Sequence, residues 1–222
     1  MNSISKQNRV CAVIPCFNEG RTIHQITTET LKYVDNVILV NDGSTDESLK
    51  LIPDDDRIIL ITSINNEGKG SALRKGFIKS IELNSDFTVT LDADFQHEPG
   101  WIPELLSGLS FADLTIGNRL NDLSTMPLQR IMSNKISSFL LSIKTGTKII
   151  DSQCGFRAFR TPVLKNILPG YNGFEAESEM LILAARKNLR IASVDISTIY
   201  GDEKSKIKPL QTIYGFLRVL FI

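Results

Sequence analysis

The sequence predicts an α/β fold in which a largely parallel sheet is covered by helices on both faces. Short apolar runs with β-branched residues alternate along the chain with longer segments whose apolar residues recur at a spacing near 3.6. The chain has 222 residues, 42% of them hydrophobic, which is enough for one sizeable core. We therefore expect one globular domain whose ligands bind at the carboxyl ends of the strands.

The expected elements follow one another in the order that such a fold requires. Apolar runs predict strands at Val10 to Ile14, Val37 to Val40, Ile58 to Thr62, Phe87 to Leu91, Leu114 to Ile116 and Ile191 to Ile199. Helical spacing predicts helices at Thr22 to Tyr33, Asp46 to Leu51, Gly70 to Leu83, Ile102 to Leu109, Arg130 to Lys144 and Phe174 to Leu189. Asp151 to Arg160 is expected to be a loop or short strand. Residues 1–208 would form the domain, and residues 209–222 a helical tail.

Charge and cysteine content exclude several classes of protein. The chain has 25 Lys and Arg residues and 25 Asp and Glu residues. The protein therefore carries no net positive charge that would favour binding of nucleic acid. Cys11, Cys16 and Cys154 form an odd set without CxxC spacing, which argues against a disulfide framework and a zinc site. The start of the chain, MNSISKQNRV, has no signal-peptide core, and no window offers about 18 uninterrupted apolar residues. We expect a cytoplasmic protein that neither spans a membrane nor is exported.

Polar or glycine-bearing segments follow each of the first five predicted strands. These segments are PCFNEG, NDGSTD, NNEGKGS, DADFQHEPG and GNR. Each one alone is weak evidence, because ordinary turns also use Gly, Asn and Asp. Five of them at one edge of a parallel sheet predict a binding site there.

The segment DADFQ carries the most specific chemistry. An extended chain would turn the oxygens of Asp92, Asp94 and Gln96 to one side. Such hard oxygens suit Mg²⁺ or Mn²⁺, which commonly take their remaining ligands from substrate phosphates. An acidic turn that caps the next helix is the alternative. An EF-hand is excluded, since His97 and Pro103 would occupy its glycine and glutamate positions.

Two other nucleotide-binding motifs are absent. A dinucleotide fold needs G-x-G-x-x-G after the first strand, where this chain has IPCFNEG, and a P-loop ending at Lys69 would need glycine in place of Ser63. Asp42 still ends a strand where such folds present a carboxylate to a ribose or base. Lys69 begins a helix, where it could meet a ligand or be an ordinary exposed lysine.

Further basic and acidic residues could lie at the same edge of the predicted sheet. Arg119 follows a strand, and Arg130, Arg157, Lys204 and Lys206 come from later segments. A diphosphate leaving group and an anionic acceptor would need such charges. A general base could come from Asp151, Glu175 or Glu177, although for Glu177 and Glu179 a solvated helix face is the stronger interpretation. We expect His97 to be a hydrogen-bonding loop side chain.

The ordered motifs together resemble a known family. They are VIPCFNE, VNDGSTD, GKGSALRKGF, LDADFQHEP, GNR, DSQCGFRAF and ISTIYGDEKSKIKP, and they span about Val10 to Pro209. The set resembles family 2 glycosyltransferases, especially the branch of dolichyl-phosphate mannose synthases and related polyprenyl-phosphate glycosyltransferases. The resemblance implies a GT-A fold with a Rossmann-like, largely parallel mixed sheet, a nucleotide-sugar donor, and Mg²⁺ or Mn²⁺.

The resemblance also implies roles for individual residues. The nucleotide-sugar would contact Pro15, Phe17, Asn18, Glu19, Asp42, Lys69, Asp92, Ala93 and Asp94. The metal would be held by Asp92, Asp94 and Gln96. Catalysis would involve Asp94, Arg119 and Asp151. Phosphate or acceptor would contact Arg119, Arg130, Ser205 and Lys206.

The implied reaction is inverting transfer of a hexose from GDP-mannose or a UDP-sugar to a polyprenyl or dolichyl phosphate. Members that use sugar hydroxyls typically carry a Glu-Asp pair, and this chain has no Glu-Asp dipeptide. The alternatives are a soluble enzyme that acts on a saccharide hydroxyl in surface polysaccharide synthesis, and a noncatalytic nucleotide-sugar binding module. Residues 209–222 would lie at the cytoplasmic face of the membrane, precede a missing membrane region, or pack on the domain.

Overall fold

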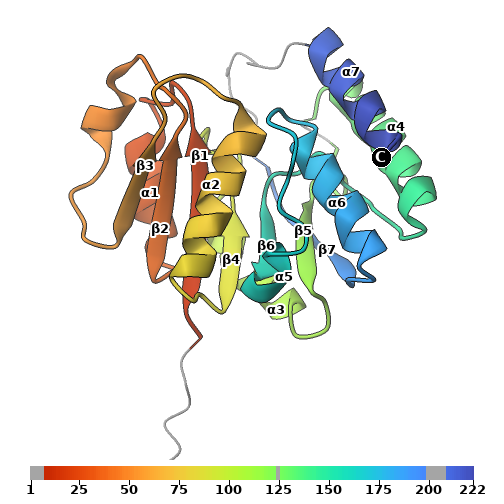
Figure 1. The fold of residues 1–222 in the computed structure, drawn as a ribbon, viewed down its shortest axis with the longest axis horizontal. Coiled ribbons are helices and arrows are strands. Elements are labelled where there is room, and N and C mark those ends of the chain that lie inside the picture. Colours follow the sequence, from red (N-terminus) through yellow and green to blue (C-terminus); the bar gives the residue numbers. More distant parts are fainter. Residues whose placement is uncertain (1–7, 124–125, 199–208) are drawn as a thin grey trace, which may run out of the picture.

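A seven-stranded sheet runs through the protein and has helices on both faces (Figure 1). The computed structural model describes residues 8–123, 126–198 and 209–222. The strands are β1 Val10–Cys16, β2 Asn36–Asn41, β3 Ile58–Thr62, β4 Phe87–Thr90, β5 Leu114–Asn118, β6 Arg157–Arg160 and β7 Ile191–Asp195. The α/β prediction is therefore confirmed.

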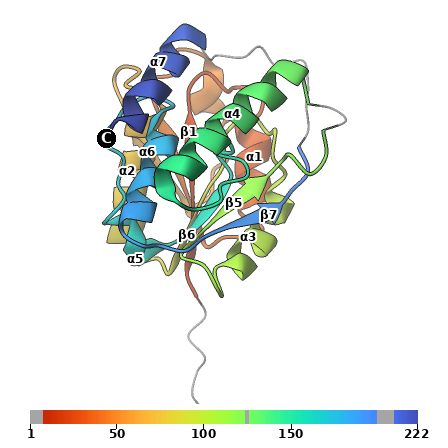
Figure 2. The same cartoon turned by 90° about the vertical axis from the view of Figure 1, so that its right-hand side faces the viewer.

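The helices form two layers. They are α1 Ile23–Thr30, α2 Lys69–Glu82, α3 Ile102–Gly108, α4 Leu128–Thr145, α5 Thr161–Leu164, α6 Ala176–Arg186 and α7 Pro209–Leu220, with short 3₁₀ helices η1 Glu47–Leu51 and η2 Pro99–Trp101. Figure 2 shows α2 and α6 on one face of the sheet and α1 and α3 on the other. No helix in the described part of the chain is long and apolar enough to cross a membrane.

The strand order explains how distant segments reach one edge. The order is β3-β2-β1-β4-β6-β5-β7, and β6 runs antiparallel to both β4 and β5, while the other neighbours are parallel. The carboxyl ends of β1, β2, β4 and β5 therefore share an edge with the amino end of β6. The segment before β6 is thereby brought to the strand ends.

Two sequence expectations need correction. The segment predicted as a helix from Asp46 to Leu51 instead forms the 3₁₀ helix η1, in which the Asp46 carboxylate caps the backbone N–H of Ser48. The last predicted strand, Ile191 to Ile199, ends at Asp195. The expected short strand before Arg160 is confirmed as β6.

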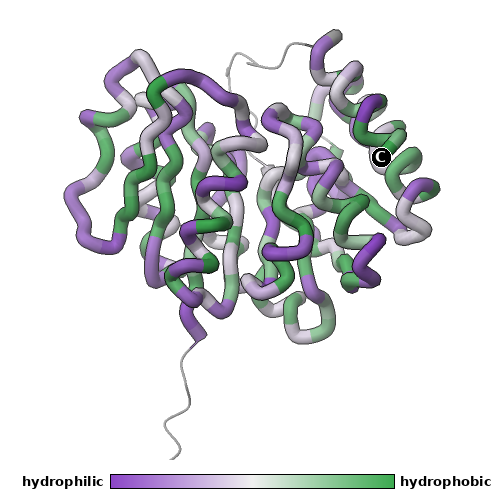
Figure 3. The backbone as a smooth tube through the Cα atoms, viewed as in Figure 1, coloured by the Kyte–Doolittle hydropathy of each residue, from purple (hydrophilic) through white to green (hydrophobic). Residues whose placement is uncertain are grey.

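The core lies between the sheet and its two helical layers. Strand β1 is buried on both faces from Cys11 to Ile14, as expected for a central strand whose apolar residues do not alternate with polar ones. Apolar residues are concentrated in the central strands (Figure 3). Phe77 of α2 and Phe159 of β6 form an edge-to-face pair with ring centroids 5.5 Å apart, which joins a helix of the first half to a strand of the second.

Gly76 is the point where α2 packs directly on β1. A Cβ atom at this position would overlap Cγ1 of the fully buried Val13. We expect Gly76→Ala to lower the free energy of unfolding by about 1–2 kcal/mol, because overpacking outweighs the gain in helix propensity. Urea unfolding would measure the loss. Gly100→Ala is the control, since its Cβ would meet only Tyr33 Oη at 3.6 Å; equal stability of the two variants would contradict this account of the packing.

Candidate active site

The loop after β1 is tied to the segment that follows β2. Asn18 has a positive φ of 55°, and its amide oxygen accepts a hydrogen bond from Thr45 N at 2.8 Å. Its own N–H donates to Ser44 Oγ at 3.0 Å, and Glu19 N donates to Ser48 Oγ at 2.9 Å. These bonds give Asn18 and Glu19 a fixed place at the strand ends. Their contact with a nucleotide, like that of Pro15 and Phe17, stays a prediction.

Asp42 is buried and orders the loop that leads into α2. Its carboxylate accepts hydrogen bonds from Glu67 N at 3.0 Å and Gly68 N at 2.8 Å. Gly68 has a φ of 103°, and a Cβ there would overlap the carbonyl of Asn172. Asp42 therefore fixes the position from which Lys69 begins the helix. A nucleoside contact by Asp42 stays a prediction.

Lys69 forms an ion-paired cluster with two acids from separate elements. Its Nζ lies 2.5 Å from Asp92 Oδ1 and 3.2 Å from Glu177 Oε1. Burial opposes the charge of Lys69, but the two carboxylates overcome it and raise the pKa of this amine above its ordinary value. Burial likewise tends to raise the pKa of Asp92, and the Lys69 charge brings it below its usual range. Both groups are therefore ionised at neutral pH.

The loop from Asp92 to Gln96 makes a tight turn at the end of β4. Asp94 Oδ1 accepts a hydrogen bond from Gln96 N at 3.0 Å, and Phe95 has a φ of 59°. The carbonyl of the buried Ala93 accepts from Thr22 Oγ1 at 2.6 Å, which ties the loop to the start of α1. These contacts fix the backbone of the loop from which the Asp92 and Asp94 side chains extend.

The donor set of this loop fits a divalent cation of the Mg²⁺ type. Two ionisable carboxylates and an amide oxygen come from one short segment, and the side chain of Asp92 is 30% exposed. Mg²⁺ and Mn²⁺ accept a few such hard oxygens together with water and phosphate. Among the described residues, no group of three or more His, Cys, Asp or Glu side chains is arranged to hold a metal ion.

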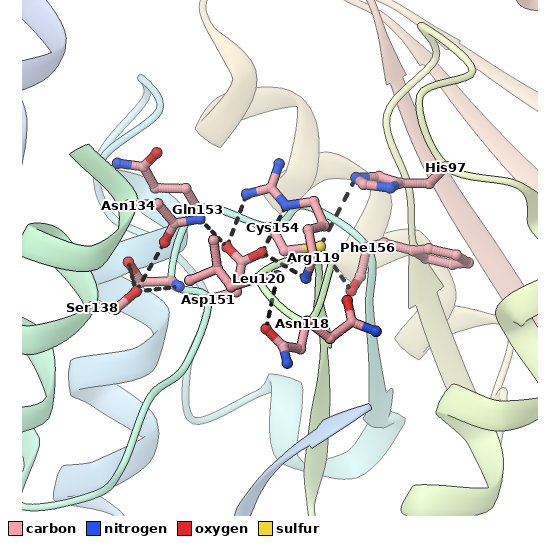
Figure 4. Close-up of polar contacts among 12 residues, drawn as sticks. His97, Asn118, Arg119, Leu120, Asn134, Ser138, Asp151, Gln153, Cys154 and Phe156 are labelled. Atoms are coloured by element: carbon pink, nitrogen blue, oxygen red, sulfur yellow. Dashed lines mark hydrogen bonds and ion pairs between the residues drawn. The ribbon is translucent and has the colours of Figure 1, made fainter. Parts of the chain in front are cut away.

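Arg119 and Asp151 form a bidentate ion pair at the end of β5 (Figure 4). Arg119 Nε donates to Asp151 Oδ2 at 2.7 Å and Nη2 donates to Oδ1 at 2.8 Å. Asn134 of α4 donates a further bond to Asp151 Oδ1 at 2.5 Å. Burial tends to raise the pKa of Asp151, and the hydrogen bonds and charge of Arg119 bring it below the usual value. The pair fixes the Arg119 guanidinium at the site edge.

His97 is a buried neutral side chain beside this pair. Its ring stacks on Phe156 with centroids 5.7 Å apart, and Nε2 lies 3.9 Å from Cys154 Sγ (Figure 4). Burial, and then the charge of Arg119, lowers the pKa of His97 to about 4. Nδ1 has no hydrogen-bond partner among the described residues. His97 is therefore uncharged at neutral pH.

Two acids of α6 are buried, so the expectation of a solvated helix face was wrong. Glu177 pairs with Lys69, and Glu179 accepts hydrogen bonds from Gly170 N and Tyr171 N at 2.8 and 3.0 Å. The sequence does indicate the burial of Glu177. This residue lies three and four positions before the apolar Met180 and Leu181, which places it on the same side of the helix.

Arg157 and the other predicted cations have different positions. Arg157 is buried and donates to the carbonyls of Ser152, Cys154 and Glu177, so it stabilises the backbone around the site and is no solvated surface charge. Arg130 lies half-buried in the first turn of α4. Ser205 and Lys206 lie outside the described residues. Acceptor contacts by these three residues stay predictions.

The buried Arg119–Asp151 pair makes the free energy of unfolding depend on pH in the acidic range. Since the pKa of Asp151 is below its unfolded value of about 4, its contribution is complete above that pH and is lost as the pH falls through the folded pKa. We expect Asp151→Asn to lower the free energy of unfolding by about 3 kcal/mol at pH 7, and by progressively less below about pH 4. Urea unfolding at several pH values would test this, with the exposed Asp56→Asn as control. A loss that is independent of pH would exclude the pair as its cause.

Comparisons with known sequences give matches along most of the chain. The sequence profile of "Glycosyl transferase family 2" matches residues 11–168. The UDP-N-acetylglucosamine–dolichyl-phosphate N-acetylglucosaminyltransferase of Methanococcus voltae is 30% identical over 228 residues, which are 92% of this chain and 90% of that protein. The undecaprenyl-phosphate 4-deoxy-4-formamido-L-arabinose transferase of Proteus mirabilis is 29% identical over 235 residues, which are 99% of this chain and 70% of that protein.

Solved structures give the same fold. The chain is similar to glucosyl-3-phosphoglycerate synthase from Mycobacterium tuberculosis in complex with Mn²⁺ and UDP-glucose, with a TM-score of 0.74 and 19% identity. The match covers 97% of this chain and 80% of that one. The predicted GT-A fold is confirmed, and the loops after β1, β2 and β4 lie within the part matched by the family. The chain is a member of glycosyl transferase family 2.

Proposed function

We propose that this enzyme transfers a hexose from a nucleotide-sugar to a polyprenyl phosphate and inverts the anomeric carbon. The observation that carries the proposal is the placement of the Arg119–Asp151 pair at the edge where Asp92 and Asp94 also lie. Carboxylates that suit a cation and a fixed guanidinium that suits a phosphate are thereby brought to one site. Residues 1–208 would form the catalytic domain in this proposal.

The donor would bind on the side of β1, β2 and β4. Asp92, Asp94 and Gln96 would hold Mg²⁺ or Mn²⁺, which when bound supplies positive charge that stabilises a departing diphosphate. Lys69 lies 2.5 Å from Asp92, so its ammonium would reach the same phosphates. The Mn²⁺ and UDP-glucose of the structurally similar synthase support a donor of this class.

The acceptor would bind on the side of β5 and α4. A phosphate monoester is anionic at neutral pH and needs no base, whereas a sugar hydroxyl does. Asp151 is a poor base, because both of its oxygens accept hydrogen bonds and its pKa is lowered. The names of the dolichyl- and undecaprenyl-phosphate relatives support the same acceptor.

The bond changes of this reaction balance without a proton transfer. An acceptor phosphate oxygen attacks the anomeric carbon from the face opposite the nucleotide and forms the new C–O bond. The bond between that carbon and the diphosphate breaks, and its electron pair leaves with the nucleoside diphosphate. Arg119 would hold the acceptor phosphate, with Arg130 nearby, and Asp151 would keep the Arg119 guanidinium in place.

A transfer assay would test the acceptor class. Purified protein would receive Mn²⁺ and labelled UDP-N-acetylglucosamine, UDP-glucose or GDP-mannose, together with either undecaprenyl phosphate or an oligosaccharide. We expect labelled product only in the lipid phosphate reactions. Product that forms only with the oligosaccharide would reject the proposal in favour of a saccharide-hydroxyl transferase. Donor-induced thermal stabilisation without product from either acceptor would favour a noncatalytic binding module.

Asp94→Asn tests the metal role of the loop after β4. The variant keeps the size of the side chain but removes the charge, so we expect transfer to fall on the order of 10²-fold or more while the urea midpoint is unchanged. Asp54→Asn, an exposed substitution between η1 and β3, is the matched control. Full activity of Asp94→Asn at saturating donor would exclude Asp94 from the metal site.

A further inference from the structure

Lys69 is the counter-ion of Asp92, one of the two carboxylates that suit a divalent cation. Its Nζ lies 2.5 Å from Asp92 Oδ1, and in the part of the chain that the structure describes no other cation is paired with this carboxylate. The second oxygen, Oδ2, lies against the backbone of Gly155, where an added Cβ would come within 2.6 Å of it. A divalent cation could therefore bind Oδ1 only after the ammonium moves away, because the two positive charges repel each other.

The backbone that carries Lys69 is fixed on both sides. Gly70 N donates to the carbonyl of Asn172 at 2.6 Å, and Gly68 N donates to the Asp42 carboxylate at 2.8 Å. A lysine side chain has four flexible carbons between such an anchor and its ammonium. An exchange of ion-pair partners by Lys69 therefore requires rotation of side-chain bonds and no movement of α2.

Glu177 gives the Lys69 ammonium a second partner. Its Oε1 lies 3.2 Å from Lys69 Nζ, and its side chain is 11% exposed. Arg157 Nη1 donates to the Glu177 carbonyl at 2.9 Å, which fixes the backbone at this position. The ring of Phe174, in the segment that leads into α6, lies 5.9 Å from the same Nζ and favours a cation there. Lys69 can thus leave Asp92 and keep an anionic partner.

The charges of the cluster indicate when the exchange occurs. Lys69 carries one positive charge between the negative charges of Asp92 and Glu177. A divalent cation that enters alone must compete with this ammonium for Asp92. A nucleoside diphosphate brings further negative charges, which attract the ammonium and the divalent cation at the same time. The exchange is therefore favoured when the diphosphate and the cation bind together.

We propose that Lys69 is an internal counter-ion that holds Asp92 until a nucleoside diphosphate and a divalent cation bind, and that Glu177 is the positioning residue that then receives its ammonium. The inference rests on the proposed function for the class of donor and for the metal role of Asp92. Glu177 would act through Lys69 and would contact neither the cation nor the diphosphate. The alternative is a permanent ion pair, which would oppose the cation equally with and without a nucleotide.

Mn²⁺ binding, followed by electron paramagnetic resonance of the free ion, tests the exchange without requiring transfer. The full chain is titrated with Mn²⁺ alone and with Mn²⁺ in the presence of UDP or GDP. In the wild type we expect the nucleotide to raise the affinity for Mn²⁺ by at least about tenfold. Lys69→Met should raise the affinity for Mn²⁺ alone by about tenfold, because the competing charge is gone, and should reduce the gain from the nucleotide by a similar factor.

Lys75→Met is the matched control for this substitution. Lys75 is a half-buried, ion-paired lysine of the same helix, and its partner is Glu67, outside the loop after β4. We expect its Mn²⁺ affinities to equal those of the wild type. An unchanged affinity of Lys69→Met for Mn²⁺ alone, or a rise that is equal with and without the nucleotide, would overturn the proposal.

Glu177→Gln tests the carboxylate that receives the ammonium. The variant keeps the size of the side chain and removes its charge, so we expect Mn²⁺ binding in the presence of the nucleotide to weaken by about tenfold. In the Lys69→Met background the same substitution should have little effect, because Glu177 acts through Lys69. Equal effects in both backgrounds would overturn the positioning role. Should circular dichroism show that Lys69→Met does not fold, unchanged Mn²⁺ affinity in Glu177→Gln alone would overturn the proposal.

The outcomes separate this inference from the proposed function. Mn²⁺ affinities that follow the expected pattern, without transfer to undecaprenyl phosphate, would count against the proposed function alone. Transfer by the wild type, with Mn²⁺ affinities that Lys69→Met leaves unchanged, would refute the exchange alone.

Discussion

The buried ion pair of Arg119 and Asp151 is the interaction on which the second half of the structure depends. It joins the end of β5 to the segment before β6, and through Asn134 it joins both to α4. A bidentate pair fixes the plane of the guanidinium as well as its position. Removing the carboxylate would leave a largely buried positive charge, so the same contact that orients Arg119 also holds the surrounding backbone together.

A second charged cluster joins two elements of the first half of the chain to α6. Lys69 comes from the start of α2, Asp92 from the end of β4 and Glu177 from α6, and the three charges meet where these elements converge. Asp42 supports the cluster indirectly, because it fixes the loop that precedes Lys69. The acids of the site are thus balanced by cations that the fold itself supplies, which allows several ionised groups to lie close together in a partly buried place.

The fold and the loops of the site could largely be predicted from sequence, because parallel strands appear as apolar runs and their polar ends stand out. Strand β6 could be expected only as a loop or short strand, since its four residues, RAFR, begin and end with arginine and its pairing with β4 and β5 is set by tertiary structure. The link from Arg119 to Asp151 spans 32 positions and has no local signal. The burial of Glu177 runs against its charge, which is typical of a solvated helix face, and only its spacing from Met180 and Leu181 indicates the buried side.

The antiparallel course of β6 divides the sheet into two units. On one side, β3, β2, β1 and β4 are consecutive parallel strands with their own loops. On the other, the chain between β5 and β6 leaves the edge, forms α4 and returns to the same edge. That excursion contacts the first unit where it returns, because Phe156 stacks on His97 and the carbonyl of Gly155 accepts a hydrogen bond from Thr90 Oγ1 at 2.8 Å. Sequence change in the excursion is therefore constrained at the residues that touch the first unit, and less constrained in α4, which lies away from it.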